Sequence, residues 1–145
     1  MSFVVPFDGS ARTETALTRA RKLARGVRES LFVISVIPSN NAGYARKMGW
    51  LASDEPFDGE TIVSTLRSQV TDIAPAATFE YEVCSREATA NSISKPIRKF
   101  AKRKDASTVV VGSDNAGRTA TSASSVGGRI AADRGYDVLI VRSRG

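Results

Sequence analysis

The chain has 145 residues, of which 41% are apolar and 25% are charged. This is the composition of an ordinary folded protein, and the length suffices for one domain, residues 1–145, with a buried core. The absence of histidine and the single cysteine, Cys84, exclude Ser-His-Asp and Cys-His catalysis, histidine-based zinc sites and an internal disulfide. No apolar run approaches the roughly 18 residues of a membrane span and no secretory signal is recognisable, so we expect a cytoplasmic protein.

The net charge of +6 raises the question of polyanion binding. Basic residues concentrate between Arg12 and Arg28 and between Lys95 and Lys104. Both groups fall on predicted amphipathic helices, where a solvated outer face is the simpler interpretation. Nucleic-acid binding is therefore a less favoured alternative, because no recognition motif and few aromatic residues accompany the clusters.

Five apolar segments bounded by turn residues predict β-strands. In chain order they are Phe3–Phe7, Leu31–Ile37, Thr78–Val83, Thr108–Val111 and Val138–Val141. All but Thr78–Val83 are nearly continuous apolar runs, which is typical of strands buried on both faces. Thr78–Val83 alternates apolar with acidic residues, as a half-exposed edge strand does.

Amphipathic helices are predicted between these strands, from apolar residues at three- and four-residue spacing. They are Ala16–Val27, Ile62–Ile73, Ile93–Ala101 and, for a short last helix, roughly Ser124–Asp133. Ser10 is the expected N-cap of the first helix, and Glu55-Pro56 marks the expected start of the second. Pro96 must lie in the first turn of the third helix or kink it.

The alternation of strand and helix predicts an α/β fold with an open parallel sheet of five strands. With right-handed crossovers and the strand order 3-2-1-4-5, the first two helices cover one face and the last two cover the other. The two basic helices then lie on opposite faces, so their charges do not combine into one groove.

The connection from Pro38 to Asp54 is longer than such loops usually are. It contains Trp50, the only tryptophan, and Tyr44–Met48 could form a helical turn. One interpretation is an insertion whose Trp50 packs back on the body of the protein. The other is a flap over the ligand site or a contact for a partner.

Ligands of open α/β sheets bind beyond the carboxyl ends of the strands, where the strand order reverses. Here that point lies between the first and fourth strands. Asp8 ends the first strand, and its carboxylate can accept hydrogen bonds from ligand hydroxyls or help to hold a metal ion. The alternative is a plain capped turn formed by Asp8, Gly9 and Ser10.

Small residues follow the fourth strand, beginning at Gly112. Backbone N–H groups of such a loop can approach a phosphate. The side chains that can add donors are Arg118, Thr121, Ser122, Ser124 and Ser125. Because no Walker A lysine motif is present, a flexible Ser/Thr-rich loop that caps a helix is the alternative.

These segments resemble the universal stress protein family. Val5–Ser10 is similar to the family's first strand and Asp-Gly-Ser turn, and Ala16-Leu17 to an Ala-Leu pair in its first helix. Val109–Ser113 resembles its fourth strand and first loop glycine, and Ser124–Arg142 its last helix and strand. The resemblance covers essentially the whole chain and implies a Rossmann-like fold of the adenine nucleotide alpha hydrolase type.

ATP-binding members of the family carry a Gly, two residues, a Gly, nine residues, then Gly followed by Ser or Thr. Gly112 matches the first glycine and Ser125 the hydroxyl residue. Asn115 stands at the second glycine, Ser124 stands one residue early at the third, and Gly117 lies two places after the second. Asn tolerates the left-handed region better than most residues, whereas Ser124 puts a side chain where backbone would approach the phosphate.

The resemblance implies a regulatory stress-response module that binds ATP, or ADP or AMP, with or without Mg²⁺. The site residues it implies are Asp8, Val36, Gly112, Asn115, Gly117, Ser124 and Ser125, with the adenine near Val36. Arg118, from the composition of the loop after the fourth strand, completes the predicted binding site. It also implies a homodimer through the apolar last strand, Val138–Val141.

We expect no efficient catalysis, because no general base in a tuned environment is evident, although slow hydrolysis through a Mg²⁺-bound water stays open. A dimeric interaction module without nucleotide is the main alternative. An enzyme of the related nucleotide-transferring α/β group is a further one.

Overall fold

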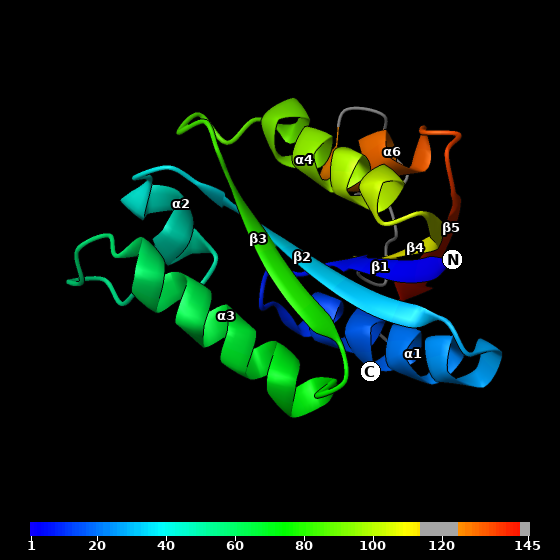
Figure 1. The fold of residues 1–145 in the computed structure, drawn as a ribbon. Coiled ribbons are helices and arrows are strands. Elements are labelled where there is room, and N and C mark those ends of the chain that lie inside the picture. Colours follow the sequence, from blue (N-terminus) through cyan, green and yellow to red (C-terminus); the bar gives the residue numbers. More distant parts are fainter. Residues whose placement is uncertain (114–124, 143–145) are drawn as a thin grey trace.

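The sheet consists of parallel strands in the order β3-β2-β1-β4-β5, as the sequence predicts. The computed structural model describes residues 1–113 and 125–142. The strands are β1 (Ser2–Pro6), β2 (Ser30–Pro38), β3 (Thr78–Cys84), β4 (Ala106–Ser113) and β5 (Asp137–Arg142). The helices are α1 (Ala11–Val27), α2 (Ala42–Lys47), α3 (Gly59–Ile73), α4 (Ala90–Arg103) and α6 (Val126–Ala131). Helices α1 and α3 cover one face of the sheet, and α4 and α6 cover the other (Figure 1).

The central strands are buried on both faces, which explains their continuous apolar sequences. Val4 and Val5 of β1 are both 0% exposed, although they belong to the cores on opposite sides of the sheet. Leu17 of α1 and Leu66 of α3 pack with Val5, whereas Phe100 of α4 packs with Val4. The two basic helices, α1 and α4, accordingly lie on opposite faces, as predicted.

Strand β3 is the predicted half-exposed edge strand. Glu80 and Glu82 lie on its α4 side, where Lys104 Nζ approaches Glu80 to 2.7 Å. Tyr81 and Val83 are 46% and 58% exposed. The alternation in the sequence therefore separates the two faces of β3, with the acidic residues paired to basic groups near α4 and the apolar Tyr81 and Val83 left exposed on the other face.

Much of the positive charge on α4 is used inside the molecule. Asp133, which is 5% exposed, accepts hydrogen bonds from Arg98 at 3.0 Å and from Lys102 at 2.8 Å. Arg103 lies 4.0 Å from Glu80 at the edge of the sheet. These ion pairs reduce the cationic surface that α4 offers to a polyanion.

Side-chain caps set the starts of α1 and α3. Ser10 caps α1, as predicted, and accepts a hydrogen bond from a first-turn N–H at 3.4 Å. The predicted start of α3 at Glu55-Pro56 is wrong. The helix begins at Gly59, because the Asp58 carboxylate accepts from the Thr61 N–H at 3.3 Å and from its hydroxyl at 2.9 Å.

The later helices differ in detail from the prediction. Pro96 lies in the interior of α4 and not in its first turn, so the Ser92 carbonyl receives no helical N–H from residue 96. The last helix is shorter than the predicted Ser124–Asp133, and Ser125 caps it. Within the described residues, no helix is long and apolar enough to cross a membrane.

Strands β2 and β4 extend beyond the end of β1 and leave a crevice there. β1 ends at Pro6, which pairs with Ile34, while β2 continues to Pro38. On the other side, β4 continues to Ser113, past its pairing with β1. The carboxyl end of β1 therefore lies at the bottom of the crevice, where the strand order reverses.

Candidate functional site

Asp8 shapes the turn that follows β1. Its Oδ1 accepts hydrogen bonds from the Ser10 N–H and the Thr13 hydroxyl, each at 2.9 Å. Gly9 has a φ of 82°, in a region that glycine adopts at little cost. Asp8 Oδ2 lies 3.8 Å from Arg12 Nη2. One carboxylate oxygen thus builds the capped turn, and the other is directed toward Arg12.

A cavity of about 450 Å³ occupies the crevice beyond β1, within the size range of small-molecule sites. Its apolar wall comes from the sheet and α4, through Ile34, Val36, Ile93, Ile97 and Val111. Polar or charged groups line the rest, including Asp8, Arg12, Thr13, Lys47 and Ser125. An apolar slot with a few polar groups is the usual form of a site for an amphipathic ligand.

The structure brings half of the predicted site residues together. Asp8, Val36, Gly112 and Ser125 line the cavity. Asn115, Gly117, Arg118 and Ser124 lie outside the described residues.

Gly112 has a packing role in addition to its place in the cavity. A Cβ atom at this position would lie 2.4 Å from the carbonyl oxygen of Arg12 and 2.8 Å from its carbonyl carbon. Strand β4 therefore approaches the first turn of α1 so closely that only glycine fits. The glycine that matches the family pattern is thus required by helix–strand packing, whether or not a phosphate binds.

The long connection after β2 contributes to the cavity, a feature that the sequence indicated only through its length and aromatic content. It forms the predicted helical turn as α2, and Tyr44, Lys47 and Met48 line the cavity. Trp50 packs back on the body, where its Nε1 donates a 2.7 Å hydrogen bond to the Asp8 carbonyl oxygen. The two interpretations of this loop therefore describe the same arrangement.

Tyr44 is the aromatic residue of α2 in the cavity, and its ring contacts Trp50 edge-on with centroids 5.6 Å apart. Burial, followed by the negative charge of Asp8, raises the pKa of Tyr44 to about 12. The phenol is therefore protonated at neutral pH, so it can donate a hydrogen bond to a ligand.

Within residues 1–113 and 125–142, no group of three or more His, Cys, Asp or Glu could hold a metal ion. Asp8 is the only carboxylate in the described lining of the cavity. This donor set suits a Mg²⁺ ion that keeps most of its ligands from phosphates and water, and not a dedicated protein cage.

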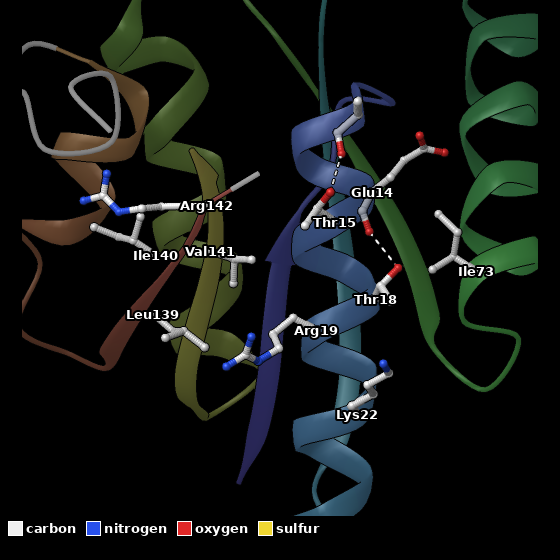
Figure 2. A pocket seen from close by; sticks show the side chains of 11 residues that line it. Glu14, Thr15, Thr18, Arg19, Lys22, Ile73, Leu139, Ile140, Val141 and Arg142 are labelled. Atoms are coloured by element: carbon white, nitrogen blue, oxygen red, sulfur yellow. Dashed lines mark hydrogen bonds between the residues drawn. The ribbon is translucent and has the colours of Figure 1, made fainter. Parts of the chain in front are cut away.

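A broader groove of about 890 Å³ lies between α1 and β5 (Figure 2). Arg19 of α1 extends toward Leu139 of β5, and Val141 and Lys22 also belong to the lining. The Thr18 hydroxyl on the α1 side is bonded within the helix, to Glu14 O at 2.9 Å. The Thr18 hydroxyl already has a hydrogen-bond partner, and the strand side of the groove is mostly apolar. The groove therefore suits contact with a macromolecule better than binding of a small ligand.

The fold and the position of the first cavity define an open α/β protein with a cavity at its topological switch point, where such folds bind ligands. The family model described as the universal stress protein family matches residues 1–142. The chain belongs to this family, which confirms the resemblance and the fold class inferred from the sequence.

Solved structures of the same fold cover nearly the whole chain. A universal stress protein in complex with cAMP aligns with a TM-score of 0.61 and 20% identity, over 98% of this chain and 96% of that chain. The universal stress protein from Archaeoglobus fulgidus in complex with dAMP aligns at 0.57 and 19%, over 97% and 96%. A family member from Burkholderia pseudomallei aligns at 0.61 and 15%, over 98% and 96%. A sequence comparison with curated proteins found no match.

Proposed function

We propose that this protein is an adenine-nucleotide-binding regulatory module of the stress response. The observation that carries the proposal is the cavity at the switch point, which places the apolar Val36 and the acidic Asp8 in one lining. Structural relatives in complex with cAMP and dAMP support an adenine nucleotide as the ligand class. Within that class we propose ATP, ADP or AMP as the physiological ligand.

The two halves of the cavity suit the two halves of a nucleotide. The adenine would lie in the apolar slot beside Val36, whose side chain is 8% exposed. The ribose would lie near Asp8, whose Oδ2 accepts no hydrogen bond within the turn. Gly112 and Ser125, which line the same cavity, would lie near the phosphates, and a Mg²⁺ ion would be held by those phosphates together with Asp8.

The proposed role is binding and not turnover. The chain has no histidine. Asp8, the only carboxylate in the described lining of the cavity, holds the turn after β1 through Oδ1, and its Oδ2 lies 3.8 Å from the Arg12 guanidinium. A general base must be free to take a proton at the reacting atom. We therefore propose a regulator whose state depends on the bound nucleotide. We also propose a cytoplasmic location, because the single cysteine, Cys84, suits a reducing compartment.

We also propose that the protein is a homodimer through β5. This strand forms one edge of the sheet, and Val138, Leu139 and Ile140 are only half-buried within the described residues. Unpaired edges with apolar side chains favour pairing with another strand. The groove in Figure 2 borders the same strand and would be closed by a second copy.

Calorimetric titration of nucleotide-stripped protein with ATP, ADP and AMP tests the nucleotide proposal. We expect dissociation constants below about 1 mM, and the Val36→Phe variant should weaken all of them because the larger ring fills the adenine slot. Val83→Phe, at an exposed position outside the cavity lining, is the matched control and should bind like the wild type. Affinities weaker than millimolar for all three nucleotides would instead support the dimeric module without nucleotide.

A further inference from the structure

Two cationic side chains from different elements, Arg12 and Lys47, line the cavity. We infer that they form the phosphate-binding pair of the site, with Lys47 supplied by the connection between β2 and α3. The inference rests on the proposed nucleotide function and adds to it the residues that recognise the phosphate. If so, the connection between β2 and α3 is part of the binding site and not only a surface loop.

Arg12 lies beside the cavity, and its guanidinium group keeps hydrogen-bond donors that a ligand can use. It is the second residue of α1, and its guanidinium lies 3.8 Å from Asp8 Oδ2, a longer separation than a direct charge-assisted hydrogen bond. The side chain is 40% exposed. The Asp8 carboxylate thus orients Arg12 and leaves N–H donors that can form a bidentate contact with a phosphate.

Lys47 has no ion-pair partner in the part of the chain that the structure describes, although the helix that carries it is fixed. Ala45 of α2 is 1% exposed. The Asn41 amide donates to Arg86 O at 2.6 Å, and Trp50 anchors the other side of α2 on Asp8 O at 2.7 Å. Lys47 is exposed, so its ammonium group is available to an anion, and because the backbone is already fixed, binding would need to order only the side chain.

The charges of the described lining favour an anion. Asp8 contributes one negative charge, whereas Arg12 and Lys47 contribute two positive charges. The wall beside Val36, formed by the sheet and α4, consists of apolar side chains that cannot donate hydrogen bonds to a phosphate. An amphipathic ligand would therefore direct its phosphate toward Arg12 and Lys47, in the same lining as Ser125.

The test compares AMP with adenosine, which differ only in the phosphate, on the full chain. In Lys47→Gln and Arg12→Gln we expect AMP affinity to fall by about tenfold, the effect of one charge-assisted hydrogen bond, with adenosine affinity unchanged. Lys99→Gln removes the same charge from an exposed position on α4 outside the cavity lining and should leave both affinities unchanged. Fluorescence of Trp50, which adjoins α2, provides the binding signal.

Each result decides the inference. Wild-type AMP affinity in Lys47→Gln, or an equal loss for adenosine and AMP, would overturn the phosphate role while leaving the nucleotide proposal intact. No binding of adenosine or AMP by the wild type would overturn both. Arg12→Lys separates contact from structure, because it keeps the charge and should recover part of the AMP affinity that Arg12→Gln loses. Unfolding midpoints equal to the wild type show that Lys47→Gln folds normally.

Discussion

The indole Nε1 of Trp50 donates a 2.7 Å hydrogen bond to the carbonyl oxygen of Asp8, across 42 positions in the sequence. This bond joins the connection after β2 to the turn at the carboxyl end of β1. Because α2 lies between Trp50 and β2 in the chain, the bond also sets the position of Tyr44 and Lys47 at the cavity. A displacement of the turn after β1 would therefore also displace α2, and the reverse.

Replacement of Trp50 by Phe tests this coupling, because it removes the donor and keeps an aromatic ring. We expect the free energy of unfolding to fall by about 1 kcal/mol, the usual net value of one hydrogen bond. Nucleotide affinity should fall as well, because α2 loses an anchor. Circular dichroism in urea measures the first effect, since the variant has no tryptophan, and calorimetry measures the second.

Tyr136→Phe is the matched control for Trp50→Phe. It removes the 2.9 Å hydrogen bond from the Tyr136 hydroxyl to Ile130 O, which lies outside the cavity lining. It should cost similar stability and leave nucleotide affinity at the wild-type value. Equal affinity losses in both variants would show that the effect of Trp50 is general destabilisation and not coupling to the site.

A second prediction concerns Gly112. Gly112→Ala would place a methyl group 2.4 Å from the Arg12 carbonyl oxygen, so β4 or α1 must shift. We expect the free energy of unfolding to fall by about 2–3 kcal/mol, as overpacking does. Gly26→Ala, where nothing lies within 4 Å of the added atom, should instead raise it by about 0.5–1 kcal/mol because alanine favours the helix. Urea unfolding of both variants checks the contrast, and a stable Gly112→Ala protein would contradict it.

The sheet could be predicted from the sequence because strands that are buried on both faces consist almost entirely of apolar residues. Val4 and Val5 are buried on opposite faces, so the whole run around them had to be apolar. Asp8 and Gly112 could be placed at the cavity for a related reason. In a parallel sheet the residues after adjacent strands meet at one edge, whatever their separation in the chain.

The contribution of α2 could not be predicted in the same way. The position of Lys47 at the cavity depends on long-range contacts of α2 and its flanks, such as the bond from Trp50 to Asp8, and such contacts leave no periodic pattern in the sequence. The prediction of where α3 starts was wrong for a local reason. Two plausible helix starts, Glu55-Pro56 and Asp58, lie close together, and the side-chain hydrogen bonds of Asp58 decide between them.

The proposed dimer predicts a specific effect of charge on β5. Leu139→Lys puts an ammonium group near Arg19 in the groove of Figure 2 and removes an apolar side chain from the edge. We expect the variant to sediment as a monomer and the wild type as a dimer. Val83→Lys makes the same kind of change on β3, the opposite edge of the sheet, and should remain dimeric. A wild-type mass of one chain, or dissociation by Val83→Lys alone, would contradict pairing through β5.

The last prediction uses Asp133, which ties α6 to α4. Burial would raise the pKa of this carboxyl, but hydrogen bonds from Lys102, the Gly135 N–H and Arg98 outweigh it and lower the pKa from 3.8 to about 2. A carboxyl whose pKa is lower in the folded state binds fewer protons there, so its stabilisation is present above about pH 4 and is lost as the pH falls toward 2.

Asp133→Asn should therefore lower the free energy of unfolding by roughly 2 kcal/mol at neutral pH. The difference from the wild type should shrink as the pH falls from about 4 to about 2, because protonation removes the same charge from the wild type. Asp105→Asn, at an exposed carboxyl 3.9 Å from the N-terminal amine, should change little. Urea unfolding of the three proteins between pH 7 and pH 2 measures the effect. A difference that stays constant over this range would mean that Asp133 stabilises the α4–α6 contact through its shape and neutral hydrogen bonds, and not through its charge.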